Sequence, residues 1–113
     1  MELRKTPRFR VEFRSAFSGE HIEGEGKMLN LSMDGCKIES DMSVGKDNVL
    51  ALRVHVPQFD YPIQVEQAAV QWTKGKEFGL EFMRVFPEGL KQLHRLITDL
   101  DQRGGRRFEL PRD

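Results

Sequence analysis

Repeated alternation of apolar and polar residues is the feature that most restricts the fold of this chain. Near the start, Phe9, Val11 and Phe13 alternate with charged residues up to a turn at residues 18–20, as in a strand with one face buried. The same alternation predicts further strands over residues 21–31, 36–40, 48–56, 63–72 and 77–85. Turn residues separate these segments, so neighbouring strands are expected to pair antiparallel.

Two of the predicted strands contain an irregularity. Gly24 and Gly26 interrupt the segment 21–31, and glycines inside a strand often mark a bulge or a tight barrel corner. In the segment 63–72 the alternation changes phase near Gln67 and Ala68, which also indicates a bulge. Residues 73–76, Thr-Lys-Gly-Lys, have the composition of a hairpin turn.

The apolar period changes to that of a helix after residue 87. Pro87 suits a first helical turn, where its missing N–H costs nothing. The residues that would form the buried stripe are Leu90, Leu93, Leu96, Ile97 and Leu100. Gly104-Gly105 ends the helix near Arg103, and residues 104–113 are expected to form a basic, solvated tail.

About six strands followed by one helix, without strand–helix alternation, predict a mainly β fold. A chain of 113 residues is long enough for one core. We therefore expect one domain over residues 1–103, built as a six-stranded antiparallel barrel with a C-terminal α-helix. Closure of the barrel removes the sheet edges that would otherwise invite aggregation.

Composition excludes several classes of function. Apolar runs are too short for a membrane span or a signal peptide, which predicts a cytoplasmic protein without membrane insertion. One cysteine and three scattered histidines offer no disulfide framework and no zinc spacing. No histidine is spaced to activate Ser32 or Cys36 as a nucleophile. We therefore predict no catalytic residue, no metal and no cofactor.

The charge balance also limits the partners. The 18 basic and 18 acidic residues cancel, which argues against a protein that grips long nucleic acid, since that affinity rests on neutralising many phosphates. Basic residues nevertheless gather at both ends of the chain. Any anionic ligand is therefore expected to be small and locally bound.

Two stretches are candidates for such a ligand site. Arg4, Lys5 and Arg8 form a cationic opening, and residues 30–35, Asn-Leu-Ser-Met-Asp-Gly, form a polar turn. Asn, Asp and Ser hydrogen-bond their own backbone in turns, and Gly supplies a positive φ. Separately, the first stretch is also explained as the solvated face of a strand and the second as a tight turn. Together they suggest a site for an anionic, hydrogen-bonding ligand.

The pattern Arg4-x-x-x-Arg8 followed by Asn30-x-Ser32-x-x-Gly35 resembles the PilZ domain, a bacterial receptor for cyclic di-GMP. That family has a six-stranded antiparallel barrel of split, Greek-key-like type with a C-terminal helix. Its late hairpin often carries an aromatic residue and then Gly-x-x-Phe, and here Trp72 precedes Gly79-Leu80-Glu81-Phe82. The resemblance spans Arg4 to about Leu100 and agrees with the fold predicted from periodicity.

The resemblance implies a role for each motif residue. Arg4 and Arg8 would hold phosphates and guanine edges of cyclic di-GMP. Asn30 stands where relatives more often have Asp, and its single carbonyl acceptor predicts a loss of affinity for guanine. Ser32 would donate to a phosphate or fix the turn, and Gly35 would let the backbone come close to the ligand.

Three further residues are secondary candidates. Leu3 stands where many relatives carry an Arg that stacks on a second ligand molecule, so one bound ligand is expected rather than a pair. Lys5 would add positive charge. Trp72 is either a core or hairpin aromatic, or lies near enough to the ligand to report on binding.

These expectations lead to three hypotheses. The first is a non-enzymatic cyclic di-GMP receptor, a monomer or weak dimer, in which a flexible arm of residues 1–8 folds over the ligand and signals to an unidentified protein partner. The second is a PilZ-like adaptor that binds a protein and does not respond to nucleotide. The third is a barrel for single-stranded nucleic acid, supported by the arginines of residues 103–107 but opposed by the zero net charge.

Overall fold

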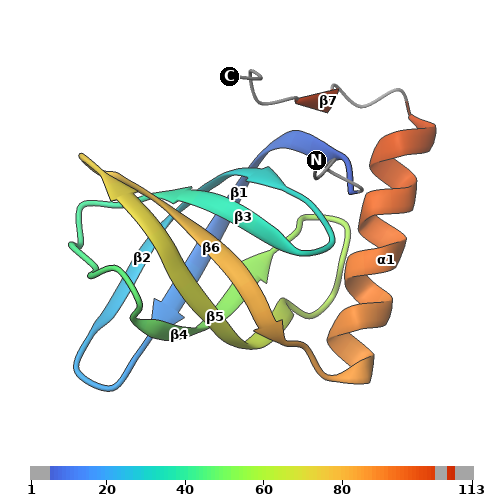
Figure 1. The fold of residues 1–113 in the computed structure, drawn as a ribbon. Helices are drawn as coiled ribbons and strands as arrows, with labels where there is room; N and C mark the ends of the chain where they lie inside the picture. The colour runs from blue at the N-terminus through green and yellow to red at the C-terminus, as the bar shows by residue number, and fades with distance from the viewer. Residues whose placement is uncertain (1–5, 104–106, 109–113) are drawn as a thin grey trace, which may run out of the picture.

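A computed structural model describes residues 6–103 and 107–108 of the chain. They form strands and one helix along the chain (Figure 1): β1 (Arg8–Ser18), β2 (Glu23–Leu31), β3 (Gly35–Glu39), β4 (Val49–His55), β5 (Ile63–Lys74), β6 (Glu77–Arg84), α1 (Pro87–Gln102) and β7 (Arg107–Phe108). The sheet order is β2-β3-β6-β5-β4-β1, and β1 also pairs with β2. This last pairing closes a six-stranded antiparallel barrel, which confirms the predicted fold.

Register shifts mark where the barrel bends. The pairing of β5 with β6 shifts between Gln67 and Ala68, at the predicted bulge. Of the two readings of Gly24 and Gly26, the bulge is wrong, because the shift in the pairing of β2 with β3 falls between Met28 and Asn30. Here β2 pairs with β3 on one side and with β1 on the other, and the pairing with β1 also shifts between Met28 and Asn30.

In each strand, alternate side chains point into the barrel, and together they form the core. Fully buried side chains come from every barrel strand, with Phe9, Met28, Ile38, Leu52, Val65 and Phe78 as examples. α1 lies alongside the barrel and contributes Leu93, Leu96 and Ile97 to the same core. Apolar burial at this density provides most of the stability of such a domain.

The predicted apolar stripe of α1 is wrong at one position. Leu90 is 44% exposed, although it has the correct helical spacing. Gly89 is the buried residue of the first turn, where a Cβ would lie 2.6 Å from the carbonyl oxygen of Gln64. This close approach of the helix to β5 turns Leu90 sideways, out of the core.

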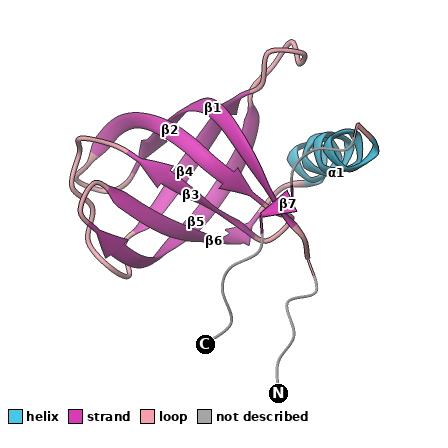
Figure 2. Ribbon diagram, turned by 90° about the horizontal axis from the view of Figure 1, so that it is seen from above, coloured by secondary structure: helices cyan, strands magenta, loops and turns pink. Residues whose placement is uncertain are grey.

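The two ends of the domain differ from the sequence prediction. β1 already begins at Arg8, so Arg8 belongs to the barrel rather than to an arm of residues 1–8. Arg107–Phe108 pairs antiparallel with Arg8–Phe9, so the prediction of a solvated tail is wrong at these two residues. Figure 2 shows β7 beside the start of β1. The other tail residues, 104–106 and 109–113, lie outside the described part of the chain.

Candidate functional site

The turn between β2 and β3 is held by its own hydrogen bonds. The backbone N–H of Ser32 donates to the carbonyl oxygen of Gly35 at 2.9 Å. The hydroxyl of Ser32 donates to Oδ1 of Asp34 at 2.6 Å and accepts from the Asp34 N–H at 3.2 Å. Ser32 is fully buried, and a hydroxyl has a single proton to donate. Of the two roles expected for Ser32, its surroundings therefore favour fixing the turn.

Gly35 is required by packing and not by its backbone angles. Among the described glycines, only Gly75 has a positive φ, so the predicted positive φ in this turn is wrong. A Cβ on Gly35 would overlap the carbonyl oxygen of Leu80 in β6. The Asp34 carbonyl oxygen accepts the Phe82 N–H at 2.9 Å. Because the turn lies this close to β6, a residue without a side chain is needed at position 35.

The structure brings Arg8 and the turn together. Nη1 of Arg8 donates to Oδ1 of Asn30 at 2.9 Å, across 22 residues of sequence. Nη2 of Arg8 lies 3.6 Å from the place that a Cβ on Gly35 would occupy. Asn30 is only 5% exposed, so its carbonyl oxygen is positioned to hold the guanidinium rather than to project into solvent. Arg8 of the first motif therefore lies directly beside the turn that carries the second motif.

Asp34 and Thr6 also belong to this site. The Thr6 hydroxyl donates to Oδ2 of Asp34 at 3.2 Å, while Oδ1 of the same carboxylate accepts from Ser32. Asp34 thus ties the segment before β1 to the turn. The sequence placed Asp34 in the polar turn but did not predict its bonds to Ser32 and Thr6, although a Ser-x-Asp pattern in a turn is a recognisable signal for the first of them.

A row of paired residues extends the site across the outside of the barrel. Arg10 pairs with Asn30, Asn30 with Lys37, Lys37 with Gly79, and Gly79 with Trp72. A shallow depression of about 510 Å³ lies over the first part of this row. Its lining residues are Arg10, Val11, Glu12, Leu29, Asn30 and Lys37. Lys37 was missed from the sequence, because the register between the strands sets its place.

Trp72 lies on the outer face of the hairpin and not in the core. Its side chain is 41% exposed, and the indole covers Gly79 so closely that a Cβ there would overlap it. Of the two structural places expected for Trp72, the core is therefore wrong and the hairpin is correct. Its position in the row places an exposed aromatic face on the same side of the barrel as Asn30 and Lys37.

Charge at the site is mostly positive. Arg8 and Arg10 lie on β1 and Lys37 on β3, the two strands that flank β2, and Lys37 is paired to Glu77 at 3.3 Å. Behind them, burial raises the pKa of the Cys36 thiol to about 12, although the positive charge of Arg8 acts in the opposite direction. The thiol is thus protonated at neutral pH and poorly nucleophilic. Leu3, Arg4 and Lys5 lie outside the described residues, so their roles stay predictions.

Metal-binding and membrane-spanning features are both absent from residues 6–103 and 107–108. No group of three or more His, Cys, Asp or Glu side chains in these ranges is arranged to hold a metal ion. No helix in the same part of the chain is long and apolar enough to cross a membrane.

Fold and site together define a small closed barrel with a basic, hydrogen-bonding face beside one turn. The family model described as the PilZ domain matches residues 2–99. The chain therefore belongs to the PilZ domain family. A search of curated protein sequences finds no match.

Several solved structures have the same fold as this chain. The inhibitor of motility MotI (DgrA) of Bacillus subtilis superposes with a TM-score of 0.73 at 17% identity, over 94% of this chain and 55% of that one. YcgR of Escherichia coli in complex with c-di-GMP superposes with a TM-score of 0.73 at 14% identity, over 89% of this chain and 47% of that one. The PilZ domain of Escherichia coli YcgR with c-di-GMP superposes with a TM-score of 0.68 at 15% identity, over 91% of this chain and 95% of that one. The chain thus spans about half the length of MotI and of the longer YcgR chain.

Proposed function

We propose that this PilZ domain is a cytoplasmic, non-enzymatic receptor that binds one molecule of cyclic di-GMP between the Arg4–Arg8 segment and the turn at residues 30–35. The observation that carries the proposal is the hydrogen bond from Arg8 to Asn30, which joins the two motifs on the outside of the barrel. Family membership supports the class of ligand, as do the two YcgR structures that contain c-di-GMP.

Arginine suits both parts of this ligand. A guanidinium carries its N–H donors in a rigid planar fork, which matches phosphate oxygens or the O6 and N7 atoms of guanine. The bond to Asn30 orients the Arg8 fork at the turn. Arg4 would supply the second fork from the segment before β1. Because Asn30 is neutral, it orients Arg8 without cancelling its charge, which an Asp at this position would do.

The row of paired residues supports secondary contacts. Lys37 and Arg10 extend the positive face away from the turn. At the other end of the row, the exposed indole of Trp72 offers a surface for stacking a guanine base. Lys5 adds charge in solution, and Leu3 in place of an arginine favours a single bound ligand.

Signalling would follow from ordering of the segment before β1. In the described part of this segment, Thr6 is held by one hydrogen bond to Asp34. Ligand contacts to Arg4 would fix the segment across the turn and so change the surface that an unidentified partner protein meets. A domain of this size acts as a monomer or weak dimer in this scheme.

One observation favours a second function, that of a nucleotide-unresponsive adaptor. Asn30 and Ser32 are each already hydrogen-bonded within the protein, Asn30 to Arg8 of the first motif and Ser32 to Asp34 of the same turn. Motif residues can therefore stabilise the barrel without any nucleotide. In that case the domain would work only by binding a protein partner.

Calorimetric titration with cyclic di-GMP separates the two functions. We expect micromolar or tighter binding by the wild-type chain and at least a tenfold loss in Arg8→Ala, because a charge-assisted contact to phosphate is removed. Arg14→Ala is the matched control, since Arg14 lies on the same strand, exposed, opposite Lys27 and His55. Equal binding by both variants would refute the site. Absence of binding by a folded wild-type chain would favour the adaptor.

A further inference from the structure

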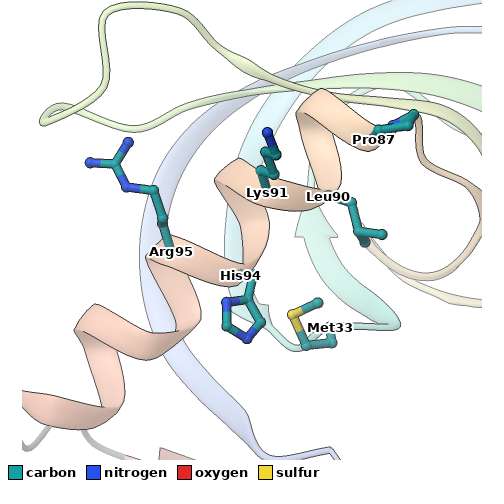
Figure 3. Close-up of a pocket in the computed structure, with 6 residues that line it drawn as sticks. All are labelled: Met33, Pro87, Leu90, Lys91, His94 and Arg95. Atoms are coloured by element: carbon teal, nitrogen blue, oxygen red, sulfur yellow. The ribbon is translucent and has the colours of Figure 1, made fainter.

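A second concave surface lies between the turn and the helix. It is a groove of about 670 Å³ whose lining residues are Met33, Pro87, Leu90, Lys91, His94 and Arg95. Figure 3 shows Leu90 and His94 pointing from α1 toward Met33, which comes from the β2–β3 turn. The lining shares no residue with the depression around Asn30.

The floor of this groove is apolar and open to solvent. Leu90 is 44% exposed because the first turn of α1 directs it away from the core. Met33 is half-buried, and its flexible thioether side chain adapts to different apolar partners. Apolar side chains gathered in a concave site, rather than scattered singly, indicate a binding surface.

The rim of the groove carries positive charge. Lys91 and Arg95 are one helical turn apart, so their side chains lie along the same side of α1. In Figure 3 both project from α1 on the side away from Met33, and the Arg95 guanidinium lies over the Phe59 ring, 5.4 Å from its centroid. Within the described residues, the lining includes no acidic side chain. An occupant that combines apolar anchors with acidic flanks is therefore complementary to this surface in both shape and charge.

We propose that this groove binds an acidic amphipathic helix of a partner protein. Its apolar residues, at i, i+3 or i+4 and i+7, would contact Met33, Pro87 and Leu90, while Glu or Asp residues beside them would meet Lys91 and Arg95. A helix fits better than an added strand, because each of the six barrel strands already has a hydrogen-bonded neighbour on both sides.

The groove and the nucleotide site share the same turn. Met33 lies between Ser32 and Asp34 in the sequence. The side chains of these two neighbours are hydrogen-bonded to each other, and Asp34 also accepts a hydrogen bond from Thr6. A ligand that tightens this turn would fix the position of Met33 and so raise the affinity for the helix. This linkage, unlike the docking itself, rests on the proposed function.

The test uses a synthetic helical peptide of about 16 residues, roughly four turns, with Leu at the anchor positions and Glu beside them. A matched peptide carries Lys in place of each Glu. Binding to the isotope-labelled full chain is measured by NMR titration without nucleotide. We expect the acidic peptide to bind at least fivefold more tightly, with amide shifts concentrated at Met33, Leu90 and His94.

Variants make the assignment falsifiable. Leu90→Asp should weaken the acidic peptide at least tenfold, whereas Tyr61→Asp, which changes an exposed aromatic outside the groove, should leave it unchanged. Lys91→Glu should reverse the preference between the two peptides. Equal binding by the Leu90 and Tyr61 variants, or shifts confined to other surfaces, would overturn the proposal. So would self-association in sedimentation that Leu90→Asp abolishes, because the occupant would then be a second copy of the chain.

Nucleotide is added only in a second arm of the experiment. Saturating cyclic di-GMP should tighten the acidic peptide at least about fivefold, the lower end of ordinary allosteric coupling. Unchanged peptide affinity in the presence of bound nucleotide would overturn the linkage and leave the docking site standing. If the nucleotide does not bind at all, the linkage falls together with the proposed function, and the nucleotide-free titrations still decide the docking site.

Discussion

Removal of one hydroxyl, in Ser32→Ala, tests how the turn of the nucleotide site is held. Ser32 is fully buried and donates to Oδ1 of Asp34 at 2.6 Å while accepting the Asp34 N–H at 3.2 Å. A hydrogen bond to a charged group contributes about 1.5–3 kcal/mol. Asp34 is exposed, so water replaces part of what is lost. We therefore expect the free energy of unfolding to fall by about 1–2 kcal/mol.

Urea denaturation followed by circular dichroism measures this change. With a slope of about 2 kcal/mol per molar urea, in the middle of the usual range for small domains, the midpoint should fall by roughly 0.5–1 M with an unchanged slope. Ser43→Ala, at an exposed serine outside the turn, is the control and should stay within about 0.5 kcal/mol of wild type.

A double-mutant cycle with Asp34→Ala gives the decisive result. If the two side chains bond each other, the double variant should be less destabilised than the sum of the single variants, by about 1 kcal/mol or more. Strict additivity would refute the proposed role of Ser32 in fixing the turn. Wild-type affinity for cyclic di-GMP in a folded Ser32→Ala chain would further show that the turn geometry does not control the nucleotide site.

Three further predictions follow from neighbouring contacts. Gly35→Ala should destabilise the domain by about 1–3 kcal/mol because its Cβ overlaps the backbone of β6, whereas Gly45→Ala, with its nearest neighbour at 3.5 Å, should be close to neutral in thermal unfolding. Cyclic di-GMP should quench the fluorescence of Trp72, the only tryptophan, and an unchanged spectrum at saturation would place the base elsewhere. Burial raises the pKa of the Cys36 thiol to about 12 from 9.0, so the unfolded chain loses this proton at a lower pH than the folded chain. The contribution of Cys36 to the free energy of unfolding should therefore be fully present below pH 9 and be lost as the pH rises toward 12. Cys36→Ala should remove this part of the pH dependence in urea titrations.

The fold was predictable because it rests on local patterns. Alternation along each strand reports which face is buried, and Pro87 with the apolar spacing after it reports the helix. The errors arose where contacts between distant segments decide. Leu90 has the spacing of a core residue, but the approach of Gly89 to β5 turns it outward. The pairing of Arg107–Phe108 with β1 has no signal in the local sequence.

The site was predictable in part. The motif residues Arg8, Asn30, Ser32 and Gly35 do come together. Charge and turn chemistry suggested that the two stretches form a site, and the family resemblance indicated the role of each residue. The places of Lys37 and Arg10 depend on the register of β1, β2 and β3, which a single sequence does not determine. The bond between Ser32 and Asp34 is local, and turn chemistry alone would have been enough to predict it.

The pairing of β7 with the start of β1 has a practical consequence for building a sensor from this domain. It brings residues 107–108 beside residues 8–9 at the start of β1, near the residues proposed to bind the nucleotide. Joining the two ends with a short flexible linker and opening the chain at Gly75, where an added Cβ would meet no atom within 4 Å, would give a circular permutant. A fluorescent protein fused at a new terminus would then lie on the hairpin of Trp72, at one end of the row of residues proposed to bind the nucleotide.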